Sequence, residues 1–229
     1  HPHGRAVLDL DVRGPERIGL AGPNGSGKTS LLRTIAGRLE PAAGTVTVSV
    51  PSRYLPQRMD VLDDALTVAE NIARLAPEAS ETERRSRLAR FLFRGRAADQ
   101  PASTLSGGER LRATLACLLL AEPAPQLLML DEPTNNLDVE ARRRLLDVVT
   151  SWRGTLLVVS HDRELLNAMD DIGELRGGRV AWYGGGYDDY EAAVAVEQDA
   201  AARAVRAAES DLRAQKRDLV ESQTKLAHR

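Results

Sequence analysis

The stretch RIGLAGPNGSGKTSLLRTIAGRL, residues 17–39, joins three local patterns that decide the fold. Arg17–Ala21 is a short, largely apolar run typical of a strand, and it leads directly into the glycine-rich loop GPNGSGKT at 22–29. Ser30–Leu39 then reads as a helix. This order is the arrangement that binds phosphate groups, because glycines let backbone N–H groups turn inward around an anion and the helix N-terminus adds a favourable dipole. The sequence therefore predicts a nucleotide site at this loop.

The lysine and threonine that end the loop supply the rest of this chemistry. Lys28 is expected to neutralise the β- and γ-phosphates, and the Thr29 hydroxyl is placed to ligate Mg²⁺. An ordinary glycine turn would need neither side chain. The residues that we assign to nucleotide binding from this pattern are Gly22, Pro23, Asn24, Gly25, Ser26, Gly27, Lys28, Thr29 and Ser30.

A fully apolar segment, Leu127–Leu130, ends in the acid pair Asp131 and Glu132. A strand of this composition is buried on both faces, and the ligands of such sheets lie at the carboxyl ends of the strands. We expect Asp131 to hold Mg²⁺ through water and Glu132 to polarise an attacking water molecule. An isolated acid pair would also fit a turn cap, so this hypothesis depends on its combination with the loop at 22–29.

A third motif, LSGGE at 105–109, places two glycines after a serine at the expected start of a helix. Backbone N–H groups exposed there form another anion site, although the serine-to-glutamate spacing alone would also fit a capping box. With this motif the chain resembles the ATP-binding cassette (ABC) family, whose signature it is. The resemblance implies that ATP is bound between two cassettes and that hydrolysis parts them. The residues that would complete the site of the opposite cassette are Ser106, Gly107, Gly108 and Glu109.

Two more polar residues match positions of the same family. Gln57, in the segment YLPQ, falls where the family has a glutamine that senses Mg²⁺ and the nucleophilic water. His161 follows the apolar run Thr155–Val159 and falls at the switch histidine that contacts the γ-phosphate, although a histidine at such a place is often structural. By this resemblance the catalytic residues are Glu132, His161 and Gln57, and the metal-binding residues are Thr29, Gln57 and Asp131.

The resemblance also suggests residues for the contact between two cassettes and for stacking on the adenine base of ATP. The segment NNLD at 135–138 resembles the loop that crosses the interface, through Asn136 and Asp138. The family stacks adenine on an aromatic residue upstream of the first loop, but residues 1–21 contain no Phe, Tyr or Trp, and His1 takes that place by spacing. The first strand of the family is also missing, so we expect a fragment or an atypical cassette.

Strands alternate with helices along residues 1–190, which predicts a mostly parallel sheet with helices on both sides. Residues 61–121 read as helices and interrupt the alternation, as a small helical subdomain would. The expected fold is α/β, and the resemblance narrows it to the P-loop NTPase cassette of the ABC type. Besides the strands already named, strands are expected at Val7–Val12, Thr45–Val50, Tyr54–Gln57 and Val180–Tyr183.

Residues 191–229 differ from the rest because they are rich in Ala, Arg and Glu and lack Gly and Pro. They predict one long helix, with an apolar seam like that of one arm of an antiparallel coiled-coil hairpin. A surface helix packed on its own domain is the alternative. The seam consists of Val205, Leu212, Leu219 and Leu226, with a weaker second row of Ala201, Ala208, Gln215 and Ser222.

Composition sets limits on where the chain works. The formal net charge is −2, which by itself predicts neither a nucleic-acid binder nor a membrane-surface binder. Cys117 is the only cysteine, which excludes an intrachain disulfide and fits a reducing, cytoplasmic compartment. No apolar run approaches the roughly 20 residues of a membrane helix, and no signal peptide begins the chain. We expect no direct membrane insertion, so another chain would supply the membrane part of any transporter.

The segment YGGGYDDY at 183–190, followed by the long charged helix, resembles the ABC-F subfamily. This resemblance implies two cassettes in one chain and action on the ribosome, near rRNA and tRNA, as a translation factor or in antibiotic resistance. The second cassette would come from a homodimer or from the other half of a longer chain. Two alternatives remain, namely the ATPase subunit of a membrane transporter and a nucleotide-binding fragment that does not hydrolyse ATP.

Overall fold

The computed structural model describes residues 8–58, 60–135 and 137–227 of the 229-residue chain, together with side chains up to Lys216 except that of residue 214. It divides into two units, His1–Tyr187 and Asp188–Arg229. The strands are β1 (Arg17–Ala21), β2 (Ser52–Leu55), β3 (Leu127–Asp131), β4 (Thr155–Val159), β5 (Asp171–Arg176) and β6 (Arg179–Gly184). The α-helices are α1 (Lys28–Ile35), α2 (Val68–Leu75), α3 (Glu81–Arg90), α4 (Gly107–Leu119), α5 (Val139–Ser151), α6 (Arg163–Asn167) and α7 (Tyr187–Ala227).

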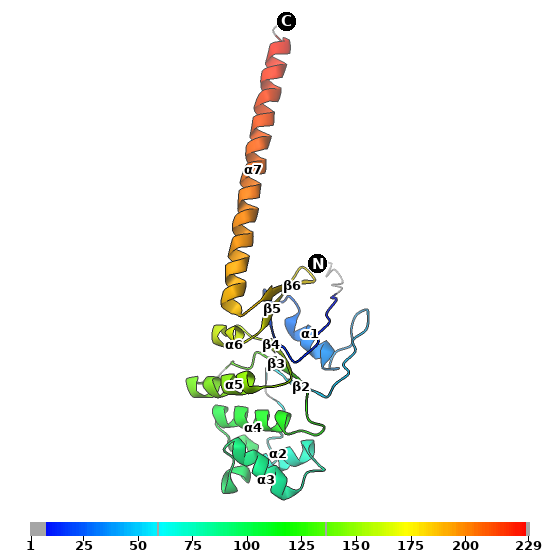
Figure 1. Ribbon diagram of the computed structural model, residues 1–229, viewed down its shortest axis with the longest axis vertical. Helices are drawn as coiled ribbons and strands as arrows, with labels where there is room; N and C mark the ends of the chain where they lie inside the picture. Colours follow the sequence, from blue (N-terminus) through cyan, green and yellow to red (C-terminus); the bar gives the residue numbers. More distant parts are fainter. Residues whose placement is uncertain (1–7, 59, 136, 228–229) are drawn as a thin grey trace. The chain divides into compact units, whose positions relative to one another are not determined.

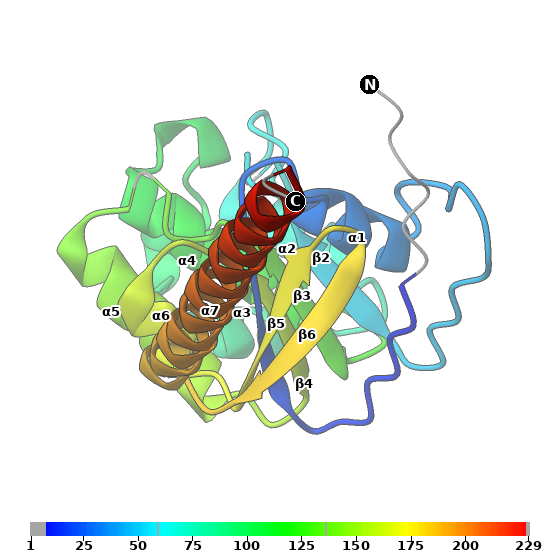
Figure 2. The same cartoon turned by 90° about the horizontal axis from the view of Figure 1, so that it is seen from above.

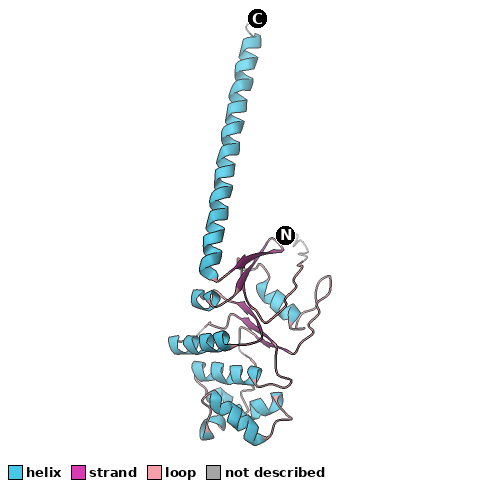
Figure 3. Cartoon of the chain, in the orientation of Figure 1, coloured by secondary structure: helices cyan, strands magenta, loops and turns pink. Residues whose placement is uncertain are grey.

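The first unit is built on a six-stranded sheet in the order β2-β3-β4-β1-β5-β6 (Figures 1 and 3). All neighbouring strands are parallel except β5 and β6, which form the antiparallel hairpin at one edge (Figure 2). The carboxyl ends of β3, β4 and β1 therefore meet side by side, and the predicted motifs follow these three strands. The expected α/β fold, with a mostly parallel sheet and a long C-terminal helix, is confirmed.

Helices cover both faces of this sheet. Ile18 and Leu20 of β1 point toward α1, where they share an apolar cluster with Leu32. Gly19 faces the other side and lies so close to Leu166 of α6 that a Cβ atom there would stand 2.8 Å from it. Burial of apolar side chains on both faces, at about 25 cal/mol per Å², holds the helices against the strands. The sheet thus provides a rigid support for the loops at its carboxyl edge.

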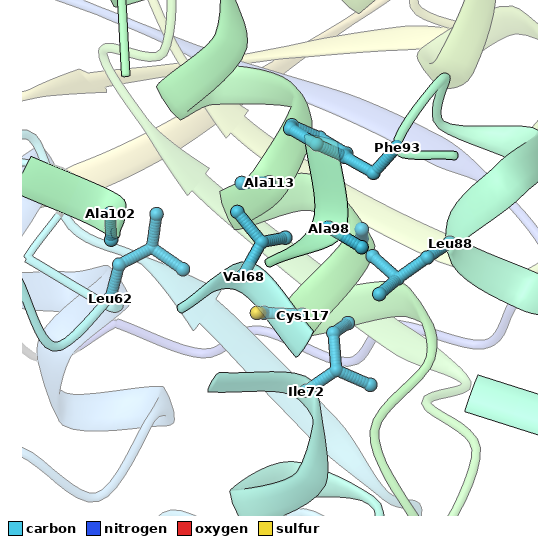
Figure 4. Close-up of a cluster of buried hydrophobic side chains, with 10 residues drawn as sticks. Leu62, Val68, Ile72, Leu88, Phe93, Ala98, Ala102, Ala113 and Cys117 are labelled. Carbon is cyan, nitrogen blue, oxygen red and sulfur yellow. The ribbon is translucent and has the colours of Figure 1, made fainter. Parts of the chain in front are cut away.

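A second apolar cluster joins α2, α3 and α4 (Figure 4). Alanines on α4 allow α2 to approach closely, because they add little bulk between the two helices. Cys117 is buried there and burial raises the pKa of its thiol to about 12, as expected for a core residue. The members that Figure 4 labels are Leu62, Val68, Ile72, Leu88, Phe93, Ala98, Ala102, Ala113 and Cys117.

The second unit is the helix α7, which is continuous to Ala227. Among its described apolar side chains, three are exposed, with exposed fractions of 67% for Val196, 58% for Val205 and 52% for Leu212. The long helix is confirmed, and its pairing with a second helical arm stays a prediction. Among the described residues, no helix has both the length and the apolar character needed to cross a membrane.

Two predicted strands are wrong. Residues 45–50 form no strand, and Val46, Val48 and Val50 are 45%, 36% and 36% exposed. Residues 8–12, the described part of the strand expected at Val7–Val12, also form none. Alternation of apolar residues gives a strand only when a neighbouring strand accepts its backbone hydrogen bonds, and the described part of this unit offers these segments no such neighbour.

The strand β5 was absent from the sequence-based assignment, which placed only Val180–Tyr183 at this end of the chain. Its sequence, DIGELR, contains a glycine and three charged residues, so it lacks the pattern of a buried strand. Tertiary pairing with β1 nevertheless buries it, including the glutamate Glu174, whose partner is Arg176 at 3.2 Å. Other boundaries differ by a few residues, and β2 begins at Ser52 rather than at Tyr54.

Candidate functional site

The glycine-rich loop lies between β1 and α1, and two glycines shape it. Gly22 has φ of 131°, and a Cβ atom there would stand 2.4 Å from the carbonyl oxygen of Leu175 on β5. Gly27 has φ of 100° at the N-cap of α1, where no side chain caps the helix. The N–H groups of the first helical turn are therefore left for a ligand, and the helix dipole favours an anion.

The side chain of Lys28 folds back into the glycine-rich loop and binds its backbone. This side chain is buried, and Nζ donates hydrogen bonds to the carbonyl oxygens of Gly22 at 2.7 Å and Pro23 at 3.1 Å. Burial lowers the pKa of the ammonium, while the negative charges of Glu132 and Asp131 oppose this effect. The loop thus holds a cation at its centre, where a phosphate chain would need one.

Asp131, at the end of β3, is fully buried and accepts a hydrogen bond at each carboxylate oxygen. The Thr29 hydroxyl donates to Oδ1 at 3.0 Å, and the Tyr54 hydroxyl donates to Oδ2 at 2.9 Å. Burial and the bond to Asp131 raise the pKa of Tyr54, with opposition from a hydrogen bond to Arg33, so the phenol keeps its proton. The contact of Tyr54 was not foreseen, because only the pairing of β2 with β3 brings it to Asp131.

Glu132 lies next to His161, with 3.3 Å between Oε1 and Nε2. The backbone N–H of Glu132 donates to the Val159 carbonyl at 2.7 Å, so the chain after β3 is fixed against the end of β4. Glu132 has φ of 50°, a region that L-residues rarely adopt, and this turn directs its backbone away from the strand. Burial raises the pKa of its carboxyl, while the neighbouring His161 opposes the shift.

This raised pKa makes a testable difference to stability. A carboxyl whose pKa is higher in the folded state stabilises the fold only while it is protonated, and that contribution is lost as the pH rises from 4.5 through the folded pKa. Glu132→Gln should therefore unfold at a temperature a few degrees higher than the parent at pH 8, with the difference shrinking toward pH 5. Thermal unfolding across this range tests the expectation, and a difference independent of pH would contradict it.

Lys28, Glu132 and His161 line one pocket with a volume of about 460 Å³, within the range of small-molecule sites. It opens at the carboxyl ends of the strands, where ligands of parallel sheets bind. The residues that line it are Asn24, Gly25, Gly27, Lys28, Thr29, Ser30, Gln57, Glu132, Asn135, Val159 and His161. Most of the predicted nucleotide-binding residues are therefore brought together with the three predicted catalytic residues. Asn135 was predicted only as part of the interface loop, and its place in the pocket follows from the tertiary structure.

The signature motif lies elsewhere in the unit. Ser106 caps α4, its hydroxyl contacts Glu109 Oε2 at 2.7 Å, and its backbone N–H donates to the same carboxylate at 3.0 Å. These bonds lower the pKa of Glu109. None of the residues 106–109 lines the pocket, which fits a role toward another chain rather than toward this site.

The structure describes only part of the predicted interface loop at 135–138 and does not describe the residue expected to stack on adenine. Asp138 caps α5 by accepting a hydrogen bond from the backbone N–H of Ala141 at 2.7 Å. Asn136 and His1 lie outside the described residues, so their predicted roles stay predictions.

Comparison with known proteins identifies the family. Residues 6–135 match the family described as ABC transporter. The chain is 37% identical over 226 residues to the ATP-binding protein Uup of Escherichia coli (strain K12), covering 93% of this chain and 35% of Uup. It is 35% identical over 188 residues to the ABC transporter F family member 3 of Arabidopsis thaliana, covering 80% of this chain and 26% of that protein. The chain thus spans about a third or less of these relatives.

A solved structure shares the fold. The dimeric structure of MJ0796, a bacterial ABC transporter cassette, matches with a TM-score of 0.68 and 23% identity, over 77% of this chain and 88% of that one. Together with the strand order and the loop geometry, these matches show that the chain belongs to the ABC transporter family and is similar to cassettes of ABC-F type proteins.

Proposed function

We propose that the pocket binds Mg·ATP and that ATP is hydrolysed there when a second cassette closes over it. The observation that carries this proposal is the convergence of Lys28, Thr29, Glu132 and His161 on one pocket at the carboxyl edge of the sheet. Phosphoryl transfer depends mainly on positioning and electrostatic stabilisation, and these side chains supply a cation, a hydroxyl, a carboxylate and an imidazole for that purpose.

Thr29 and Asp131 carry oxygen atoms that are suited to bind Mg²⁺. The Thr29 hydroxyl and the Asp131 carboxylate are 3.0 Å apart, and such hard oxygen donors are what Mg²⁺ prefers. No group of three or more His, Cys, Asp or Glu residues suited to a metal occurs in the described part of the chain, so phosphate oxygens and water would complete the coordination. When bound, Mg²⁺ would neutralise charge on the phosphates. Thr29, Asp131 and Gln57 are the residues proposed to hold it.

Glu132 and His161 act on the reacting end of the nucleotide in this proposal. The buried Glu132 carboxylate, with a raised pKa, is suited to orient a water molecule and to accept hydrogen bonds from it. His161 contacts Glu132 and has an exposed side chain, so it can reach a γ-phosphate while it keeps the carboxylate in place. We assign to it the stabilisation of charge that develops on that phosphate.

The other half of the site comes from a second cassette, either a homodimer partner or the remainder of a longer chain. The residues 106–109 begin α4 but do not line the pocket of their own chain, which supports a contact in trans. Similarity to a cassette solved as a dimer supports the same arrangement. Ser106, Gly107 and Gly108 would then offer the N-terminus of α4 to the opposite γ-phosphate.

The intact protein is proposed to act on the ribosome in the cytoplasm, in contact with rRNA or tRNA, as a translation factor or as a ribosome-protection factor against antibiotics. Similarity to an F family member and the long helix α7, which begins within the segment at 183–190, support this proposal. Closure of two cassettes on ATP would change the separation of the elements attached to them, and this movement would be the mechanical output.

Co-sedimentation with purified ribosomes tests the ribosomal role. The Glu132→Gln variant of the full-length parent protein should pellet with ribosomes when Mg·ATP is present and remain in the supernatant without it. The double variant Lys28→Ala, Glu132→Gln is the matched control and should not pellet in either condition. If the ATP-bound protein fails to pellet, the ribosomal role is wrong, and an ATPase subunit that serves a membrane transporter becomes the function to test.

A further inference from the structure

The carboxylate of Asp131 is fixed by two hydroxyl groups that come from different elements. Thr29 reaches it from the first turn of α1, and Tyr54 reaches it from β2. The contact with Thr29 joins two motifs that the sequence already links to nucleotide binding. The contact with Tyr54 brings in the first residue of the YLPQ segment, to which the sequence assigns no role of its own.

Strand register explains why Tyr54 meets Asp131. In the parallel pair β2 and β3, Tyr54 is aligned with Met129, and Asp131 lies two residues farther along the same face. Such diagonal neighbours have Cβ atoms about 7–8 Å apart, a gap that a long aromatic side chain spans. The Tyr54 ring packs in the apolar cluster between the sheet and α1, and only its hydroxyl extends to the carboxylate. A phenylalanine would fill the same space without the hydrogen bond.

The chain that leaves β2 after Tyr54 reaches the pocket. Gln57 follows Tyr54 by three residues and lines the pocket beside Thr29. A hydrogen bond from Tyr54 to Asp131 therefore fixes the carboxylate and also ties the end of β2, from which the Gln57 loop departs, to the end of β3. The positive charge of Arg33 on α1 also acts on the Tyr54 phenol, where it opposes the rise in pKa.

We propose that Tyr54 is a positioning residue for the metal of the ATP site, holding one oxygen of Asp131 so that the other remains directed toward Thr29 and the metal. This inference rests on the proposed assignment of Asp131 to Mg²⁺. Groups that orient a metal-binding carboxylate from behind commonly change metal affinity 10- to 100-fold. Tyr54 touches neither nucleotide nor water in this role.

The test separates binding of the metal from binding of the nucleotide. Tyr54→Phe keeps the ring and removes the hydroxyl, and Tyr183→Phe on β6, at the opposite edge of the sheet, is the matched control. Mn²⁺ binding to the complex with a non-hydrolysable ATP analogue is followed by electron paramagnetic resonance, and analogue binding is measured separately in EDTA. For Tyr54→Phe we expect Mn²⁺ affinity to fall about tenfold, with metal-free nucleotide affinity within roughly twofold of the parent. Tyr183→Phe should match the parent in both.

The results of these measurements distinguish the role of Tyr54 from the metal assignment of Asp131. Unchanged Mn²⁺ affinity in Tyr54→Phe, or an equal loss in Tyr183→Phe, would overturn the role of Tyr54 and leave the proposed function intact. Absence of Mn²⁺ binding by the parent complex would overturn the metal assignment of Asp131 itself. If Tyr54→Phe fails to fold by circular dichroism, Arg33→Met on the exposed side of α1 replaces it. That variant should also weaken Mn²⁺ binding, by roughly two- to threefold, and an unchanged affinity would refute the inference.

Discussion

Glu132→Gln is expected to lower the rate of ATP hydrolysis by about 10²–10⁴-fold while ATP binding is retained. The glutamine keeps the size of the side chain and its contact with His161, but it cannot act as a base toward the attacking water. Lys28, Thr29 and Asp131 are untouched, so the phosphate and metal contacts remain. The composite site should then form and fail to turn over, which traps two cassettes in the closed, ATP-bound state.

Phosphate release and size-exclusion chromatography measure the two parts of this expectation. With Mg·ATP, Glu132→Gln should elute as a stable dimer or as a more compact two-cassette chain, and it should release little phosphate. Glu174→Gln is a matched control, because Glu174 is another buried glutamate but does not line the pocket. If Glu132→Gln hydrolyses ATP at the parent rate, Glu132 does not orient the water.

Lys28→Ala should strongly weaken nucleotide binding. The Lys28 ammonium is buried within the loop and is the cation held at its centre, so its loss would leave the phosphates of ATP without their nearest positive charge. Removing one partner of a buried charged pair costs about 2–5 kcal/mol, which weakens binding by roughly 30- to several-thousand-fold. The effect should be large both with and without Mg²⁺, in contrast to that of Tyr54→Phe.

Titration with a fluorescent ATP analogue provides the measurement. Lys216→Ala is the control, because it removes the same side chain from an exposed position on α7. Circular dichroism of both variants shows whether the fold is kept. Undiminished binding by Lys28→Ala would refute the assignment of the loop at 22–29 to the phosphates.

The segments that the sequence determined by itself are those in which one local pattern carries the whole physical requirement. The loop at 22–29 needs glycines for its backbone and a lysine for its charge, and these are readable without any partner. The strand β3 is apolar at four successive positions and then acidic, which predicts both its burial and its position at the ligand edge. The alternation of strands and helices predicted the α/β class in the same way, and the resemblance of the motifs to the ABC family narrowed it to the cassette fold.

Only the tertiary structure decided which segments pair. The alternation at 45–50 resembled a strand more closely than DIGELR at 171–176 did, yet only the latter is in the sheet, because β1 and β6 flank it and supply its hydrogen bonds. Tyr54 and Asn135 reach the site through strand register and loop conformation, which depend on residues distant in the chain. Local sequence specifies the chemistry that each segment can offer, and hydrogen bonding between distant segments determines which of those groups meet.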